Sequence, residues 1–220
     1  MLLRRSKQKM DYKILKNKVL FLGLLMQLTI MIPSLRAESF FVRPTQQGGY
    51  GTGDGLSYAN AFNGLNALVW GSGTGEIGAG DTLWVIGTHT GETLNIQESG
   101  NDSNSFVRIR GDYDPLNHAV IDGNSLVNIA IYIDGHKYIK ISNLNIKNSL
   151  VNEILVKAQT GNVDGIVLEY LNIDHSLSAA TSEANTIWFR NTYGLEMKNV
   201  FILNCTVKAT QQPGVYANSD

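Results

Sequence analysis

The feature that most constrains the fold of this chain is an internal repeat in its second half. Three stretches share one apolar pattern: YIKISNLNIKN (138–148), GIVLEYLNIDH (165–175) and GLEMKNVFILN (194–204). In each stretch two apolar residues alternate, two residues intervene, and two more apolar residues alternate. The matching apolar sets are Ile139, Ile141, Leu144 and Ile146, then Ile166, Leu168, Leu171 and Ile173, then Leu195, Met197, Val200 and Ile202. The stretches follow one another at offsets of 27 and 29 residues.

Alternation of apolar and polar residues indicates β-strands, and self-similarity at this period is typical of solenoids. A β-sandwich also contains many short strands, but it would not explain the self-similarity. A further alternating segment precedes each repeat: IAIYID (129–134), EILVKA (153–158) and TIWFRN (186–191). We therefore predict an all-β fold, a parallel β-helix with three strands per coil and a period of about 27–29 residues.

The two residues between the alternating pairs form a tight bend in this scheme. Asn143 and Asn199 occupy equivalent bend positions, and Tyr170 lies at the matching position of the middle repeat. Asparagine tolerates left-handed backbone and can bond to neighbouring main chain. We therefore predict an asparagine ladder along the solenoid.

Residues 1–37 differ in character from the rest of the chain. Seven Lys and Arg residues lie between positions 4 and 18, an apolar run from Val19 to about Ile32 follows, and Pro33 ends it. This order describes a secretory signal peptide, which we expect to be cleaved near Ala37. The alternative is an uncleaved membrane anchor, although the apolar run is short for a span of about 20 residues. We therefore expect a secreted or cell-surface protein that meets the membrane only through export.

Removal of this leader changes the charge balance. Residues 38–220 carry ten Lys and Arg against eighteen Asp and Glu, a formal charge of −8. An acidic exported protein is a poor binder of nucleic acid, so we expect no nucleic-acid partner. Cys205 is the only cysteine, which rules out an internal disulfide, and no Cys/His cluster has the spacing of a zinc site.

The mature part begins with a glycine-rich run, GGYGTGDGLSYANAF (48–62), in which glycines occupy every second position from Gly49 to Gly55. The spacing fits neither a dinucleotide fingerprint nor a phosphate-binding loop. It approaches a calcium-binding nonapeptide, but Gly53 stands where that motif has Asp, and the unit is not repeated. The run is therefore interpreted as a loop rather than as a nucleotide or calcium site.

A helix is predicted directly after this loop. Ser57 is a good helix N-cap, and apolar residues follow it at helical spacing. We therefore predict an N-terminal loop and capping helix over 38–80, with the helix at 57–69 covering the first coil. The parallel β-helix is then expected over 81–220.

Several stretches are similar to one known group of proteins. They are FFVRPTQQGGYGTGDGLSYANAFNGL (40–65), GDTLWVIGTHTG (80–91), FVRIRG (106–111), AVIDG (119–123) and YIKISNLNI (138–146). Together they resemble the opening of secreted right-handed parallel β-helix proteins of the pectate-lyase-like superfamily, over about residues 40–220. That superfamily includes pectate, alginate and chondroitin lyases, polygalacturonases and non-catalytic surface proteins, so the resemblance does not settle the activity. Its members usually have more coils, and we expect this chain to be a fragment whose β-helix is incomplete at the C-terminus.

The resemblance implies a substrate groove along the segment that precedes each repeat. With Ile131 and Ile133 and their counterparts inward, the alternate residues point outward. One outward column is Tyr132, Leu155, Trp188 and Tyr216, and the next is Asp134, Lys157, Arg190 and Asn218. Aromatic rings can stack on sugars and cations can pair with uronate carboxylates, so the two columns predict a strip that binds polysaccharide. Outward aromatic and charged residues are also common on any sheet, which is the alternative interpretation.

The chemistry of a lyase assigns roles within this strip. β-Elimination needs a base near C5 of the sugar and a positive charge on its carboxylate, and Lys157 and Arg190 are the candidate catalytic residues. Asp134 is a candidate metal ligand for calcium, although calcium takes six or more oxygens. No Asp-Asp pair is present for an inverting hydrolase. The candidate substrate-binding residues are Tyr132, Trp188, Tyr216 and Asn218.

Two functions follow from these observations. The first is a secreted, monomeric, polysaccharide lyase-like enzyme that acts on an acidic polysaccharide, with calcium as its one candidate cofactor. The second is a non-catalytic cell-surface or adhesion module that binds glycans, since the sequence shows no convincing catalytic cluster.

Overall fold

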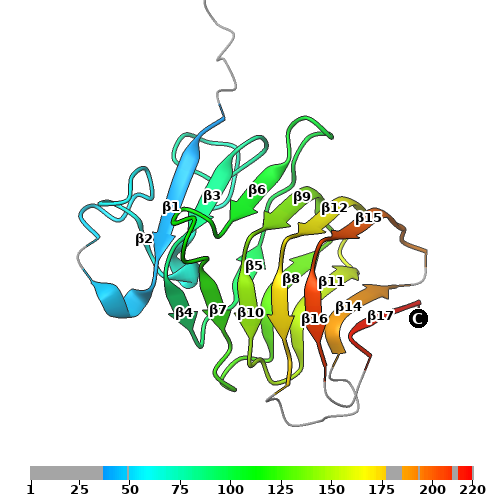
Figure 1. The fold of residues 1–220 in the computed structure, drawn as a ribbon. Coiled ribbons are helices and arrows are strands. Elements are labelled where there is room, and N and C mark those ends of the chain that lie inside the picture. The colour runs from blue at the N-terminus through cyan, green and yellow to red at the C-terminus, as the bar shows by residue number, and fades with distance from the viewer. Residues whose placement is uncertain (1–36, 49, 177–184, 193, 210–212, 220) are drawn as a thin grey trace, which may run out of the picture. The chain divides into compact units, whose positions relative to one another are not determined.

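The computed structural model describes residues 37–48, 50–176, 185–192, 194–209 and 213–219. These residues form an all-β fold of three sheets, and the strand pairings within the sheets are parallel (Figure 1). The predicted signal peptide at 1–37 falls outside the described residues except for Ala37. Within the described ranges no helix is long and apolar enough to cross a membrane.

The three sheets differ in length. The first sheet comprises β1 (Ser39–Arg43), β2 (Phe62–Asn63), β3 (Thr82–Val85), β6 (Val107–Arg110), β9 (Lys137–Ser142), β12 (Val163–Glu169) and β15 (Met197–Leu203). The second sheet comprises β4 (Thr88–Thr90), β7 (Val120–Asp122), β10 (Asn145–Lys147), β13 (Asn172–Asp174) and β16 (Thr206–Lys208). The third sheet comprises β5 (Leu94–Ile96), β8 (Ile129–Asp134), β11 (Asn152–Ala158), β14 (Asn185–Asn191) and β17 (Val215–Ser219).

From β3 onward the chain visits the first, second and third sheets in a fixed cycle. We call one passage through the three sheets a coil. Each strand pairs with the equivalent strand of the next coil, as β8 pairs with β11 and β11 with β14 (Figure 1). The prediction of an all-β fold with three parallel strands per coil is therefore confirmed, and the arrangement is compatible with a parallel β-helix.

The core lies between the three sheets and is built from columns of aliphatic side chains. Alternate residues of each strand point inward, so residues paired between coils stack on one another. Burial contributes roughly 1.5–3 kcal/mol for each such side chain. The fully buried columns include Val107–Ile139–Ile166 in the first sheet, Ile121–Ile146–Ile173 in the second, and Ile131–Ile154–Ile187 in the third.

The register predicted for the third repeat is wrong by five residues. The sequence alignment placed Leu195 and Met197 opposite Ile166 and Leu168, but the structure pairs Ile166 with Val200. The offset in the first sheet is therefore 27 residues from Ile139 to Ile166 and 34 from Ile166 to Val200. The extra length comes mainly from the connection between β13 and β14, which spans ten residues, 175–184, where the previous coil uses four, 148–151. A longer connection leaves the strand pairing intact, so the repeat period alone does not set the register.

The predicted asparagine ladder is also misplaced. The bend between the first and second sheets is occupied by Asn143, Tyr170 and Asn204, with φ of 57°, 53° and 54°. Asn199 lies instead inside β15, opposite Gly165, where φ is again positive at 53°. The hydrogen bond between asparagine side chains of adjacent coils joins Asn172 Nδ2 to Asn145 Oδ1 over 3.2 Å. Left-handed bends thus recur as predicted, but asparagine is not needed at each of them.

The predicted α-helix at 57–69 is wrong. Ser57 does accept a hydrogen bond from the Asn60 N–H through its Oγ at 3.2 Å, as an N-cap would. The chain then enters β2, where Phe62 pairs with Val42 of β1, and makes one short 3₁₀ turn, η2 (Leu65–Ala67). Gly64 separates the two elements with φ of 85°, a conformation that helices do not contain. A second 3₁₀ turn, η1 (Thr45–Gln47), follows β1.

Candidate functional site

The predicted strip lies on the outward face of the third sheet. β8, β11, β14 and β17 pair in sequence, so their side chains form two neighbouring columns. The first column is Tyr132, Leu155, Trp188 and Tyr216, and the second is Asp134, Lys157, Arg190 and Asn218. Adjacent strands of a sheet lie about 4.8 Å apart. We call these eight residues the third-sheet strip.

The aromatic side chains of the strip differ in exposure. Trp188 is 9% exposed and Tyr216 is 41% exposed, and their ring centroids lie 6.4 Å apart. The indole Nε1 of Trp188 donates a hydrogen bond to Asn218 Oδ1 at 2.9 Å, and the Arg190 guanidinium lies 5.3 Å from the Trp188 ring. Trp188 therefore contacts Asn218 and Arg190 from a buried position, while the ring of Tyr216 is exposed to solvent.

Asp134 is held by hydrogen bonds from both sides of the strip. Its Oδ1 accepts the backbone N–H groups of Gln159 and Thr160 at 2.9 and 3.0 Å, and its Oδ2 accepts the Tyr132 hydroxyl at 3.0 Å. Burial works to raise the pKa of Asp134, but these bonds and the charge of Lys157 lower it below its usual value. Burial and the bond to Asp134 raise the pKa of Tyr132 to about 12. Asp134 thus remains charged and fastens the turn after β11.

The described residues do not add a group of metal ligands to Asp134, the predicted calcium ligand. The residues that the structure describes contain no group of three or more His, Cys, Asp or Glu placed to hold a metal ion. Both Asp134 oxygens already accept hydrogen bonds, from two backbone N–H groups and one hydroxyl. Calcium binding stays a prediction.

Lys157 and Arg190 occupy paired positions on β11 and β14. The Lys157 ammonium contacts Gln159 Oε1, and both lie on the same side of β11 as Asp134 of the neighbouring strand. The structure thus brings together the two side chains that the sequence assigned to catalysis.

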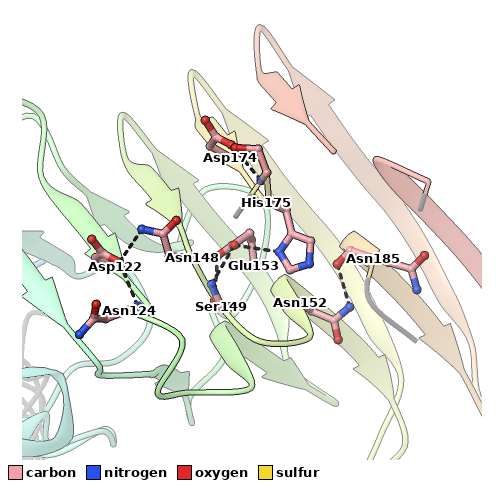
Figure 2. Close-up of polar contacts among 10 residues, drawn as sticks. Asp122, Asn124, Asn148, Ser149, Asn152, Glu153, Asp174, His175 and Asn185 are labelled. Atoms are coloured by element: carbon pink, nitrogen blue, oxygen red, sulfur yellow. Dashed lines mark hydrogen bonds and ion pairs between the residues drawn. The ribbon is translucent and has the colours of Figure 1, made fainter. Parts of the chain in front are cut away.

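A buried polar cluster that the sequence reasoning missed lies beside the strip (Figure 2). Glu153 precedes Leu155 on β11 and is fully buried. Its carboxylate accepts the backbone N–H and hydroxyl of Ser149 at 3.0 and 2.8 Å, and His175 Nδ1 lies 2.9 Å from its Oε1. The cluster joins the start of β11 to the connections that follow β10 and β13. A charged residue at the start of an apolar strand was the only available sequence signal.

Further polar contacts continue this cluster along the solenoid (Figure 2). Asp122 Oδ1 accepts the Asn124 N–H and the Asn148 amide, each at 2.9 Å. Burial works to raise the pKa of Asp122, but these bonds and Lys147 hold it below its usual value. Asn152 Nδ2 donates to the Asn185 carbonyl at 2.8 Å, which links β11 to β14. The connections on this side are thus tied to each other from coil to coil.

A separate pocket of about 640 Å³ lies beside the final strands β14, β15 and β17. Its walls include Phe189, Val200, Ile202 and Ala217, which point to the inner side of the coil. Val215 on the same inner side is 46% exposed. This pocket is the interior of the last described coil rather than a groove on the outward face.

Comparisons with known proteins do not assign the chain to a group. No family model matches it, and no curated protein is significantly similar to it. The relation to the pectate-lyase-like superfamily therefore stays a prediction.

Proposed function

We propose that this chain belongs to a secreted, carbohydrate-active, right-handed parallel β-helix protein of the pectate-lyase-like kind, which binds an acidic polysaccharide along the third-sheet strip. Right-handed crossovers are the rule for parallel strands in one sheet. The observation that carries the proposal is that Lys157 and Arg190 occupy paired positions on adjacent strands. The exposed ring of Tyr216 lies on the next strand, β17. Cations separated by one strand spacing suit the carboxylates of a uronate chain, and an exposed ring suits the face of a sugar.

The same two cations define the reaction that the proposal includes. In β-elimination a base removes the C5 proton, the released electron pair forms the C4–C5 double bond, and the C4–O bond breaks so that the oxygen leaves with a proton. Arg190 is suited to neutralise the uronate carboxylate, because guanidinium pairs with carboxylate through two parallel bonds. Lys157 is then the candidate base.

A non-catalytic glycan-binding module is the second candidate, and one observation favours it. A lysine that acts as a base must first lose a proton, whereas a lysine that binds an anionic sugar acts in its ordinary charged form. Asp134 lies in the same column as Lys157 and remains charged. This arrangement suits Lys157 as a cation that holds a carboxylate more directly than as a base.

Two measurements on the full chain separate these functions. Affinity electrophoresis in gels that contain pectate, alginate or chondroitin sulfate measures binding, and the ultraviolet absorbance of unsaturated products measures elimination, with and without calcium. Arg190→Gln and Lys157→Gln should each weaken binding, whereas Lys208→Gln, on the outer side of the second sheet, should not. Retardation without any absorbance supports the binding module. If none of the polysaccharides changes the mobility of the protein, both functions are contradicted.

A further inference from the structure

A second pocket, of about 390 Å³, lies on the outward face of the first sheet. This volume is within the range of roughly 300–1,000 Å³ that small-molecule sites occupy. The pocket is formed where β6, β9 and β12 run side by side: Arg108 pairs with Lys140, and Arg110 pairs with Ser142, which pairs with Glu169. Besides Ser142, the polar groups that line it are Arg108, Arg110, Lys140, Asn143, Glu169 and Tyr170.

Positive charge is concentrated at this pocket in an acidic chain. Residues 38–220 have a formal charge of −8, yet three of their ten basic residues line this one pocket. Lys140 is paired with Glu169 at 2.8 Å, and Arg110 with Asp112 at 2.6 Å. Arg108 donates only to backbone carbonyls, those of Gly80, Phe106 and Asn104, and the described residues place no carboxylate within ion-pair distance of it. The pocket therefore has a net positive charge.

Aromatic rings lie next to Arg110, one of the residues that line the pocket. Arg110 lies 4.7 Å above the ring of Trp84, with which it pairs across β3 and β6. Tyr113 packs edge-on against Trp84 at 5.9 Å and stacks on Tyr58 at 5.7 Å. Tyr58 and Tyr113 are 43% and 45% exposed. Exposed rings next to cations are the features that recognise a sugar which carries a negative charge.

Tyr170 is held in an unfavourable backbone conformation at the pocket wall. Its φ is 53°, which a bulky residue rarely adopts, and its side chain is 54% exposed. The equivalent positions of the coils on either side are Asn143 and Asn204, a residue type that tolerates this conformation. Strained residues of this kind cluster at binding sites, where the surrounding structure fixes them. The strained backbone therefore holds an aromatic ring that is exposed and does not pack in the core.

We propose that this first-sheet pocket is a second glycan site, which binds one carboxylate-bearing sugar ring of an acidic saccharide. Arg108 and Lys140 hold the carboxylate, the Tyr170 ring covers one face of the sugar, and Asn143 bonds to its hydroxyl groups. Glu169 is the internal anion that the ligand carboxylate replaces as the partner of Lys140. The site lies on a different sheet from the third-sheet strip and does not require that strip to function.

The test uses the full chain with Arg190→Gln as the background, so that the third-sheet strip is already weakened. Tri-galacturonate is titrated by isothermal calorimetry. Its methyl ester tests the need for the carboxylate, and sodium acetate tests whether a carboxylate without a sugar ring suffices. We expect tri-galacturonate to bind and the ester and acetate to show no binding at the same concentrations.

Four substitutions then locate the binding. Arg108→Gln should weaken it at least about tenfold, because it removes a charge-assisted contact. Tyr170→Asn should weaken it about three- to tenfold through loss of the ring. Glu169→Gln should strengthen it about two- to fivefold, because the competing anion is gone. Lys198→Gln, an exposed cation on β15 of the same sheet, is the matched control and should change nothing.

Thermal unfolding checks that each variant still folds, so that a loss of affinity can be assigned to the site. Tyr170→Asn should unfold at or above the temperature of the parent, since asparagine suits the left-handed position. Unchanged affinity in both Arg108→Gln and Tyr170→Asn would overturn the proposal, and so would equal binding of acetate or no binding of tri-galacturonate. If the third-sheet strip does not bind polysaccharide but the first-sheet pocket still binds tri-galacturonate, only the proposed function is refuted.

Discussion

His175 Nδ1 lies 2.9 Å from Glu153 Oε1, and both side chains are buried. Ser149 donates its N–H to Oε1 and its hydroxyl to Oε2 of the same carboxylate. The connection after β10 and the start of β11, which follow each other in the chain, thus meet the end of β13 at one buried carboxyl group (Figure 2). We expect this cluster to stabilise the start of β11, the strand that carries Leu155 and Lys157 of the third-sheet strip.

Glu153→Ala should lower the free energy of unfolding by about 3–5 kcal/mol, because it leaves buried donors of Ser149 and His175 without their acceptor. Urea denaturation followed by circular dichroism measures this change. Glu196→Ala, at an exposed acidic position on the first-sheet side, is the matched control and should stay within about 0.5 kcal/mol of the parent. A loss at Glu153 no larger than that at Glu196 would show that the cluster contributes nothing to stability.

Acid should destabilise the N-terminal end of the solenoid through Glu92. Burial works to raise the pKa of Glu92, but hydrogen bonds from His89, Thr45 and the Leu65 N–H lower it to about 2 from 4.5. Because the folded pKa lies below the unfolded one, the stabilisation is fully present above about pH 4.5 and is lost as the pH falls toward 2.

Urea denaturation at a series of pH values between 6 and 2 checks this prediction. Glu92→Gln should be less stable than the parent at pH 6 and should lose less stability on acidification. Glu196→Gln should keep the slope of the parent. If the stability of the parent and of Glu92→Gln falls equally with pH, another group than Glu92 causes the acid sensitivity.

The glycine-rich run offers a comparison of two left-handed glycines. Gly53 has φ of 68° and open space around the position of an added Cβ, whereas Gly55 has φ of 77° and a Cβ there would lie 2.2 Å from Phe62 Cε2. Gly53→Ala should cost about 1–2 kcal/mol for the conformation alone. Gly55→Ala should cost a further 1–3 kcal/mol or so, because Phe62 must move out of the core. Chemical denaturation of both variants measures the difference, and equal losses would refute the close approach.

Tyr216→Ala should weaken binding of an acidic polysaccharide by about three- to tenfold, because it removes the exposed ring of the third-sheet strip. Affinity electrophoresis measures this effect. Leu203→Ala is the control, since Leu203 is similarly exposed, at 44%, but lies on the first sheet. Equal retardation of Tyr216→Ala and the parent would remove Tyr216 from the site.

Much of the fold follows from local geometry. Successive side chains of a strand point to opposite faces, so the alternation in IAIYID and its counterparts determined which residues enter the core and which form the two outward columns. The same alternation predicted the parallel neighbours Tyr132, Leu155, Trp188 and Tyr216 correctly, because in these strands the pattern begins at the same point of each coil. The apolar spacing after Ser57 led to the wrong prediction of a helix. The same spacing also suits a turn that places Phe62 in the sheet.

The register of the last coil and the polar sites were decided only by tertiary structure. Strand pairing depends on which backbone groups meet across coils, and the ten-residue connection before β14 shifts the sequence offset without changing that pairing. His175 lies 22 positions from Glu153, and the first-sheet pocket joins residues from Arg108 to Tyr170, and no local pattern encodes such contacts. The sequence by itself determined the strands and the direction of their side chains, because these depend on neighbouring residues. The tertiary structure decided which charges meet, because stacking of coils brings distant residues within bonding distance.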